Sequence, residues 1–332
     1  MLHLKVNDVI GLGNTLMDFL IKVDEPTLSS LNLTKGEFHL IDQQKANAIL
    51  SSLAMQQLSM QTVPGGSSAN TLRGIAFLGG KAILYGKVGQ DHHGATYINQ
   101  MEDHGVISRI SARADMITGH AITFITPDAQ RTFSVHLGAA VYLTKDDVLE
   151  DDIMKSKILH IEGYQVEGPT QATIVHALEL AKKHQTLVSM DLADPGVIRR
   201  NKTFLRTIVK KYVDILFVNE QEAEEFTNLK VPAAAVKELG EWVKIAVVKV
   251  GIEGSLINFQ NTITKINAFS VRAIDTTGAG DSYAAGFLYG YCQGWKIEDA
   301  GKLGSLFASK IVEQIGVKMK HLNAEELKKK IK

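Results

Sequence analysis

The chain of 332 residues contains a single cysteine, Cys292, so it cannot form an intrachain disulfide. The lack of disulfides suits a protein that works in a reducing compartment. Cys292 lies in an apolar stretch, and we interpret it as a core residue rather than a nucleophile. The first residues lack the basic segment and long apolar run of a secretory signal. We therefore expect a cytoplasmic protein.

Long apolar runs and an excess of either charge are also missing. No stretch approaches the roughly 18 apolar residues that a membrane span requires, so we expect no membrane contact. Lysine plus arginine and aspartate plus glutamate number 36 each, which gives no electrostatic reason to expect nucleic acid. With only six prolines and no low-complexity tract, a disordered linker is not expected either. Neither nucleic acid nor a membrane is therefore an expected partner.

The sequence does contain short apolar or β-branched runs that alternate with amphipathic segments. Near-continuous apolar runs of this kind are typical of parallel strands covered on both faces. The segment 170–184 has the spacing of an amphipathic helix. The alternation predicts an α/β fold, a doubly wound and mostly parallel αβα sandwich. The runs expected as strands are 9–13, 82–86, 158–161, 187–191, 215–218 and 245–249.

Two regions, about 15–41 and 113–137, interrupt this rhythm and lack a long helical pattern. Residues 120–126 and 131–137 are strand-like, and 127–130 between them have turn composition. We expect the two regions to pair into a small second sheet. Because they lie far apart in the sequence, this sheet is expected to be a lid on the main domain.

A glycine-rich turn at 275–281 carries the strongest chemical signal. Gly278 and Gly280, on either side of Ala279, permit a close approach of the backbone to a ligand. Free N–H groups at the start of the helix that follows would attract an anion such as a transferring phosphoryl group. Asp281, in the first helical turn, could accept the proton of an attacking hydroxyl. The alternative is a plain turn in which the aspartate only caps the helix.

Two common nucleotide-binding motifs are not present. The Walker A pattern is absent, and the motif beginning at Gly11 and Gly13 has Leu16 where a dinucleotide fingerprint requires glycine. These absences argue against a P-loop enzyme and against a nicotinamide cofactor.

The segment 275–290 resembles the C-terminal signature of the ribokinase-like sugar and nucleoside kinases, also called the PfkB family. A second match, to the N-terminal signature, begins at 64–70 and continues through Gly79 to Gly94. The resemblance covers roughly residues 7–316. It implies that 1–332 form a single ribokinase-like kinase domain, with the lid built on it.

The resemblance also implies where the acceptor binds. Asn14, Asp18 and Asn70 match acceptor-binding positions of the family, and their amide and carboxylate groups can hydrogen-bond sugar hydroxyls. Gly65 and Gly66 would let the backbone approach the sugar. By itself Asn14 could be a turn residue and Asp18 an exposed charge, but the two signatures together favour binding.

A further group of residues is implied for ATP and magnesium. Asn219 and Glu222 resemble the family's Asn-x-x-Glu motif, which implies that Glu222 organises Mg²⁺ through water, since this ion usually keeps several waters. Lys249, Gly251 and Thr276 are expected contacts of ATP. The alternative for the motif is helix capping by Asn219. Whether a monovalent cation such as K⁺ is also required stays open.

The acceptor itself is indicated by weaker features, which resemble the adenosine kinases of the family. Asp18 follows Asn14 by four residues, and Ser67 stands where ribokinases commonly have lysine. In the lid and beside it, several residues are expected to meet a nucleoside: the apolar or aromatic side chains would contact the base, and the arginine would reach the phosphates. They are Leu16, Leu40, Arg131, Phe133 and Tyr164.

We therefore expect an ATP-dependent kinase in which Asp281 takes the proton of the 5′-hydroxyl of a nucleoside, most simply adenosine in purine salvage. The first alternative is a ribokinase-like or fructokinase-like sugar kinase acting on a pentose or ketohexose. A second is an inactive, ligand-binding member of the fold. A lid can cover one site or join two copies, so a monomer and a homodimer both remain open.

Overall fold

The computed structural model describes residues 4–36, 38–56, 58, 60–127 and 131–332. In this part of the chain, nine strands form one large sheet in the order β14-β13-β12-β11-β10-β9-β1-β5-β6. The sheet is parallel except for β13 and β14, which add as antiparallel neighbours at one edge. All six runs that we expected as strands lie in this sheet. The strands are β1 (Asn7–Leu12), β5 (Ala82–Gly89), β6 (Ile107–Arg113), β9 (Ser156–Glu162), β10 (Leu187–Asp191), β11 (Ile215–Asn219), β12 (Ile245–Lys249), β13 (Ser255–Phe259) and β14 (Thr262–Ile266).

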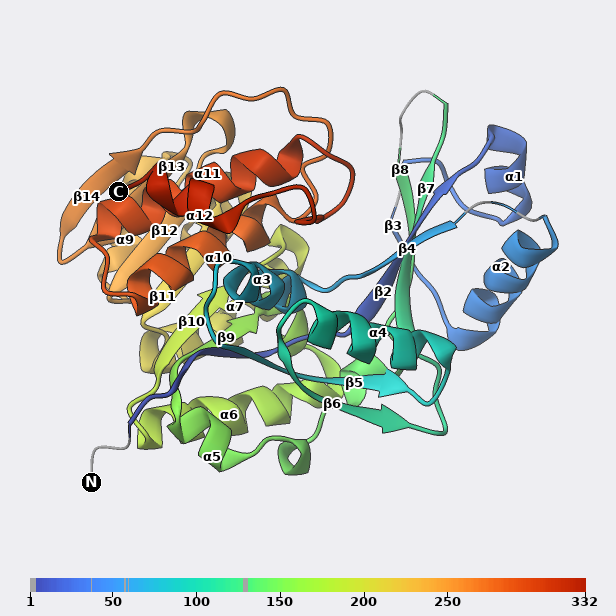
Figure 1. Ribbon diagram of the computed structural model, residues 1–332, viewed down its shortest axis with the longest axis horizontal. Helices are drawn as coiled ribbons and strands as arrows, with labels where there is room; N and C mark the ends of the chain where they lie inside the picture. The colour runs from blue at the N-terminus through green and yellow to red at the C-terminus, as the bar shows by residue number, and fades with distance from the viewer. Residues whose placement is uncertain (1–3, 37, 57, 59, 128–130) are drawn as a thin grey trace.

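Helices cover both faces of the large sheet (Figure 1). Neighbouring strand residues point to opposite faces, so Val247 packs into one hydrophobic layer and Val248 into the other. The first layer contains α3 (Ser67–Phe77), α4 (His92–Asp103), α10 (Ala279–Cys292), α11 (Ile297–Val312) and α12 (Ala324–Lys329). The second contains α5 (Glu150–Met154), α6 (Gln171–Lys183), α7 (Pro195–Tyr212), α8 (Glu220–Thr227) and α9 (Pro232–Gly240). The predicted αβα sandwich is confirmed.

Five more strands, as far as the described residues show, form a second, smaller sheet in the order β3-β8-β7-β2-β4, which stands to one side of the main domain (Figure 1). We call this sheet, with its two helices, the lid. Its strands are β2 (Leu16–Lys22), β3 (Phe38–Leu40), β4 (Met60–Pro64), β7 (Gly119–Ile125) and β8 (Arg131–His136), and its helices are α1 (Glu25–Ser30) and α2 (Gln43–Met55). β4 lies outside the two segments in which we expected lid strands. Its five-residue run from Met60 is only partly apolar, which explains why it gave no clear strand signal.

Alternation along β2 gives the lid two different faces. Met17, Phe19 and Ile21 are fully buried, whereas Leu16 and Asp18 are half-buried. The buried residues share one apolar cluster with residues of α1 and α2, which cover that face. The other face, which carries Asp18, is directed toward the main domain.

None of the helices in the described residues is both long and apolar enough to cross a membrane.

Candidate active site

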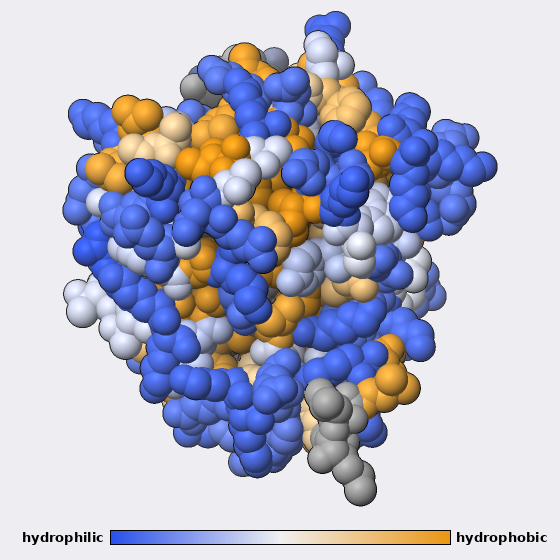
Figure 2. Space-filling model, turned by 90° about the vertical axis from the view of Figure 1, so that its left-hand side faces the viewer, coloured by the Kyte–Doolittle hydropathy of each residue, from blue (hydrophilic) through white to orange (hydrophobic). Residues whose placement is uncertain are grey.

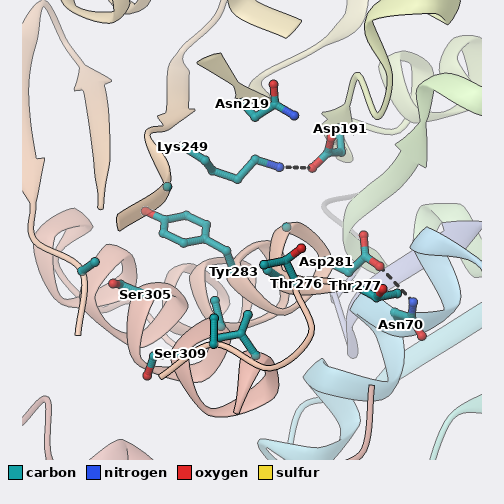
Figure 3. A pocket seen from close by; sticks show the side chains of 18 of the residues that line it. Asn70, Asp191, Asn219, Lys249, Thr276, Thr277, Asp281, Tyr283, Ser305 and Ser309 are labelled. Atoms are coloured by element: carbon teal, nitrogen blue, oxygen red, sulfur yellow. Dashed lines mark hydrogen bonds and ion pairs between the residues drawn. The ribbon is translucent and has the colours of Figure 1, made fainter. Parts of the chain in front are cut away.

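A cavity of about 1120 Å³ lies where the parallel strands end (Figure 3). Four polar residues are the last residues of adjacent strands: Glu162 of β9, Asp191 of β10, Asn219 of β11 and Lys249 of β12. All except Glu162 line the cavity. In open α/β sheets, ligands bind outside the carboxyl ends of the strands. The cavity is therefore the candidate active site.

The glycine-rich turn forms one wall of the cavity and precedes α10. Gly278 has a φ of 72°, and a Cβ on this residue would lie 2.1 Å from Cγ2 of Val317. Both the backbone angle and this contact therefore require glycine. The buried Asp275 carboxylate accepts hydrogen bonds from the N–H groups of Thr277 (2.9 Å) and Gly316 (2.8 Å), which fix the turn. The first N–H groups of α10 have no partner within the helix and can bind an anion.

Asp281 lies in the first turn of α10 and faces the cavity. Its carboxylate accepts hydrogen bonds from Oγ of Ser67 (2.7 Å) and Nδ2 of Asn70 (2.9 Å), both on α3. Burial raises the pKa of Asp281 to about 6, although the two hydrogen bonds lower it. A carboxylate with this pKa is mostly ionised near neutral pH and can accept a proton.

Lys249 crosses the cavity toward Asp191, as Figure 3 shows. Its Nζ lies 2.7 Å from Oδ2 of Asp191. A Cβ on Gly280 would lie 2.9 Å from the same Nζ, so the ammonium group stands directly beside the glycine-rich turn. Burial lowers the pKa of Lys249, but the carboxylates of Asp191 and Glu222 outweigh this effect and raise it. The side chain is therefore a permanent positive charge at the predicted phosphate site.

Asn219 and Glu222 form a capping box at the start of α8. The Glu222 carboxylate accepts hydrogen bonds from the backbone N–H (2.7 Å) and the side-chain Nδ2 (2.5 Å) of Asn219. Glu222 is buried, and burial and the nearby Asp191 raise its pKa. The capping that we considered as an alternative is thus present, but the carboxyl group also lines the cavity.

Asp18 of β2 also lines the cavity, near enough to Asp281 for the charge of that carboxylate to act on it. Burial raises the pKa of Asp18 to about 7, although the charge of Arg73 lowers it. A Cβ on Gly65 would lie 2.3 Å from the Asp18 carboxyl group, and one on Gly66 would lie 2.1 Å from the carbonyl oxygen of Asn14. The structure therefore brings these predicted residues together, with both glycines required by close approach.

The side-chain oxygens of Asn14 and Asn70 are buried and have no hydrogen-bond partner among the described residues. Buried polar atoms in proteins are nearly always paired. Because each oxygen can accept a hydrogen bond, the two are suited to the hydroxyl groups of an acceptor.

Of the residues that we expected near the base, one that lies outside the lid is found at the cavity. Tyr164 lines the cavity, and its hydroxyl donates a 3.4 Å hydrogen bond to the carbonyl of Ala193. Leu16 and Phe133 are half-buried in the lid, and Leu40 is 65% exposed; in the described chain these three are not among the lining residues. Arg131 begins β8, but its side chain is outside the part of the chain that the structure describes. Of the residues expected at ATP, Gly251 and Thr276 both line the cavity.

Sequence reasoning missed Glu162 and Asp191. Glu162 is almost fully buried, and its carboxylate accepts hydrogen bonds from the backbone N–H of Ser68 (2.6 Å) and of Asn14 (3.3 Å). Burial raises the pKa of Glu162 to about 7. Asp191 ends a run that we expected to be a strand and Glu162 directly follows another, and this position was the signal that could have identified both.

Part of the cavity wall is apolar and was also missed. Ile252, Phe269, Val271, Ala308 and Val312 line it. Ile252 is 97% exposed and Phe269 38% exposed. Seen from the side of the β14 edge, hydrophobic residues reach the surface among hydrophilic ones (Figure 2). An apolar wall formed by these five side chains suits a flat aromatic ring such as a nucleobase.

Comparisons with known proteins agree with this geometry. The structure of an adenosine kinase from Sinorhizobium meliloti superposes with a TM-score of 0.85 and 31% identity, covering 98% of each chain. A probable sugar kinase from Rhizobium etli CFN 42 superposes with a TM-score of 0.86 and 31% identity, covering 99% of this chain and 98% of the other. A 5-dehydro-2-deoxygluconokinase of Clostridium perfringens is 31% identical over 75% of this chain and 78% of its own.

The fold and the cavity at its strand ends define a phosphotransferase of the ribokinase-like type. Residues 34–322 match the pfkB family of carbohydrate kinases, and the chain belongs to this family. It is therefore a kinase, and membership of the family implies the use of ATP. The expectation of a PfkB kinase is confirmed.

Proposed function

We propose that the protein transfers the γ-phosphoryl group of ATP to the 5′-hydroxyl of a nucleoside, with adenosine as the preferred acceptor. The observation that carries this proposal is the composition of the lid face that bears Asp18. The strand registers place the residues of this face next to one another, and most of those near Asp18 are apolar. On β2, β7, β8 and β3 the apolar residues include Leu16, Leu20, Ala121, Phe133, Val135 and Leu40, and the polar residues of the face include Lys22, Gln61 and Thr123.

This composition favours a nucleoside over a free sugar. Asp18 offers a carboxylate for ribose hydroxyls, whereas the residues around it offer dispersion and apolar contact. A nucleoside needs both kinds of surface, since its ribose is polar and its base is a flat ring. A lid for a small sugar would need further polar groups in place of residues such as Leu20 and Val135.

The proposed reaction uses Asp281 as the base. Asp281 accepts the proton of the 5′-hydroxyl, whose oxygen forms a bond to the γ-phosphorus while the bond to the β,γ-bridging oxygen breaks and ADP leaves. The N–H groups around Gly278 and Gly280, together with the ammonium group of Lys249, stabilise the negative charge of the transferring group. Ser67 and Asn70 orient the base through the hydrogen bonds described above.

The residues present fit a magnesium ion bound mainly through water and phosphate. The described residues contain no cluster of three or more histidine, cysteine, aspartate or glutamate side chains able to hold a metal. Both oxygens of Glu222 already accept hydrogen bonds from Asn219, which suits an ion that keeps several waters. Glu222 and Asp191 would hold it through those waters, and the bound ion would neutralise phosphate charge.

A sugar kinase is the second candidate. It is favoured by the sugar kinase and the 5-dehydro-2-deoxygluconokinase found among the relatives at 31% identity. Such a kinase would use the same base and glycine-rich turn, and would differ in the lid.

An acceptor screen tests the proposal. ADP formation would be measured at fixed Mg-ATP with adenosine, inosine, guanosine, ribose, fructose and 5-dehydro-2-deoxygluconate, with an acceptor-free control. We expect kcat/KM to be highest for adenosine. Preference for a sugar or sugar acid would replace the nucleoside proposal with the second candidate, and no phosphorylation of any acceptor would indicate an inactive binding protein.

A further inference from the structure

Arg73 is an arginine of α3 that lies in the core with 2% of its surface exposed. Its Nη1 donates a 2.5 Å hydrogen bond to the carbonyl of Pro64, and its Nη2 donates a 2.6 Å bond to the carbonyl of Val317. Its Nε is buried without a hydrogen-bond partner among the described residues. A buried guanidinium is costly unless it is paired, so the position calls for an explanation.

The first carbonyl belongs to the turn on the acceptor side. Pro64 ends β4, and the next residue, Gly65, lies against the Asp18 carboxyl group. Gly65 is held from two further directions, because its N–H donates to the carbonyl of Leu16 (2.7 Å) and its carbonyl accepts from the Tyr97 hydroxyl (2.8 Å). Arg73 and Tyr97 therefore bind consecutive carbonyl groups at the point where the lid joins α3.

The second carbonyl belongs to the segment that supports the glycine-rich turn. The side chain of Val317 fills the space where Gly278 has no Cβ. The preceding residue, Gly316, donates its N–H to the Asp275 carboxylate. The two amino groups of one guanidinium thus hold the backbone beside Asp18 and the backbone beside the phosphate turn.

Two carboxylates act on the charge of Arg73, Asp18 on β2 and Asp281 on α10; the hydroxyl of Tyr97 on α4 also lies near, but burial raises its pKa and keeps it neutral. The two carboxylates are the groups that we propose to bind and deprotonate the acceptor. A positive charge near both offsets their mutual repulsion and keeps Asp18 ionised at lower pH than burial alone would allow.

We propose that Arg73 is a positioning residue, which joins the acceptor half and the phosphate half of the site and fixes the distance between Asp18 and the glycine-rich turn. This inference rests on the proposed function, because it assigns Asp18 and Asp281 to the acceptor. Arg73 touches neither the acceptor nor ATP and acts through the two carbonyl groups and through its charge.

Two substitutions separate these contributions. Arg73→Met removes both the hydrogen bonds and the charge, whereas Arg73→Lys keeps the charge but cannot reach both carbonyls in the same geometry. Both variants should lose acceptor kcat/KM on the order of 10²-fold, because a displacement of about 1 Å at a reacting centre has such an effect. The KM for ATP should change by less than about threefold, since the hydrogen bonds of Arg73 go to Pro64 and Val317 and not to Lys249, Gly251 or Thr276, the residues expected at ATP. Only Arg73→Met should also move the acidic limb of kcat/KM to higher pH.

Arg206→Met is the matched control. Arg206 also donates to a backbone carbonyl, that of Phe226 (2.7 Å), and stacks on Trp242, but it belongs to the opposite helical layer. This variant should lose thermal stability and keep the acceptor KM and the pH profile of the wild type. If Arg73→Met does not fold, the two single variants Arg73→Lys and Tyr97→Phe test the inference through the same kinetic constants. Tyr97→Phe is informative because it frees the neighbouring carbonyl of Gly65 without changing a charge.

The inference is overturned if the Arg73 variants lose only stability, as Arg206→Met does, with acceptor KM and kcat of the wild type. It is also overturned if the KM for ATP rises as much as that for the acceptor. A wild-type protein that phosphorylates no compound in the acceptor screen would contradict the proposed function instead, so the two failures are distinguishable.

Discussion

The glycine-rich turn and the lid are the two sides of one cavity, but they are built in different ways. The turn is a contiguous segment, 275–281, whose shape depends on one positive φ and one buried carboxylate. The lid takes its strands from segments spread over residues 16–136, and its contribution depends on side chains. The difference teaches that the shape of the turn is set largely by one short segment, whereas the composition of the lid face is set by tertiary arrangement.

The relatives are consistent with this division. At 31% identity and nearly full coverage, this chain resembles one protein described as an adenosine kinase and another described as a probable sugar kinase. Overall similarity therefore identifies the family without selecting the acceptor. Substitutions on the two sides of the cavity should affect different kinetic constants.

The largest expected effect is on the phosphate side, at Asp281. Asp281→Asn should lower kcat by about 10³-fold or more, because general base catalysis contributes roughly 10²–10⁴-fold and burial has tuned this carboxylate to the task. The KM for ATP, measured in steady-state assays, should change little. Asp299→Asn, which removes a carboxylate from the first turn of the neighbouring helix α11, should keep wild-type activity. A near-normal kcat of Asp281→Asn would show that Asp281 is not the general base.

The next effect concerns the shape of the turn. Gly278→Ala forces an L side chain into a positive φ and against Val317, so the N–H groups of α10 should move and kcat should fall on the order of 10²-fold. Gly294→Ala is the control, since Gly294 has the same φ of 72° at the other end of α10 but no atom within 4 Å of a Cβ. If kcat fell equally in both variants, backbone strain alone would explain the loss, and the N–H groups at the start of α10 would have no special role in catalysis.

A smaller effect is expected from pH. Asp281 accepts a proton only when ionised, and its pKa is raised to about 6, so the rate should fall as pH decreases through this value. At pH 5 the loss should be about tenfold relative to pH 8, from the ionised fraction alone. Protonation of Asp18, with a pKa of about 7, should appear in kcat/KM for the acceptor at higher pH than the loss in kcat. A profile that is flat from pH 8 to 5 would contradict both assignments.

The smallest effect is expected in the lid. Leu40→Ala removes an apolar side chain that is 65% exposed, so the fold should lose little stability. The KM for the acceptor should rise about threefold to tenfold, as the loss of a modest apolar contact predicts, with kcat and the KM for ATP unchanged. Met55→Ala, at a 78% exposed position of α2, should change none of these constants. If Leu40→Ala raised the KM for ATP as much as the KM for the acceptor, the lid and the glycine-rich turn would not have separate roles.

Several features of the fold and site followed from the sequence because their causes are local. Continuous apolar runs identified six strands of the large sheet, since parallel strands are buried on both faces. The turn before α10 was recognisable because its backbone requires glycine at particular positions.

The features that were not predicted depend on distant partners. β4 gave little signal, since its outer half is exposed and its pairing with β2 decides its conformation. Glu162 and Arg73 become meaningful only when the fold places them next to the backbone of Ser68 and Val317. A local sequence pattern cannot reveal these two contacts, because they join residues 94 and 244 positions apart.

The position of β1 inside the large sheet, with a strand on each side, has a consequence for the synthesis of the protein. β1 is paired on one side with β5 and on the other with β9, whose residues 156–162 are translated much later. At about 5–20 residues per second, the ribosome needs roughly 7 to 30 s to pass from the end of β1 to the start of β9. During this interval the first strand has at least one unpaired edge, which can pair with the wrong chain. We expect the nascent chain to be most prone to aggregation until β9 has left the ribosome.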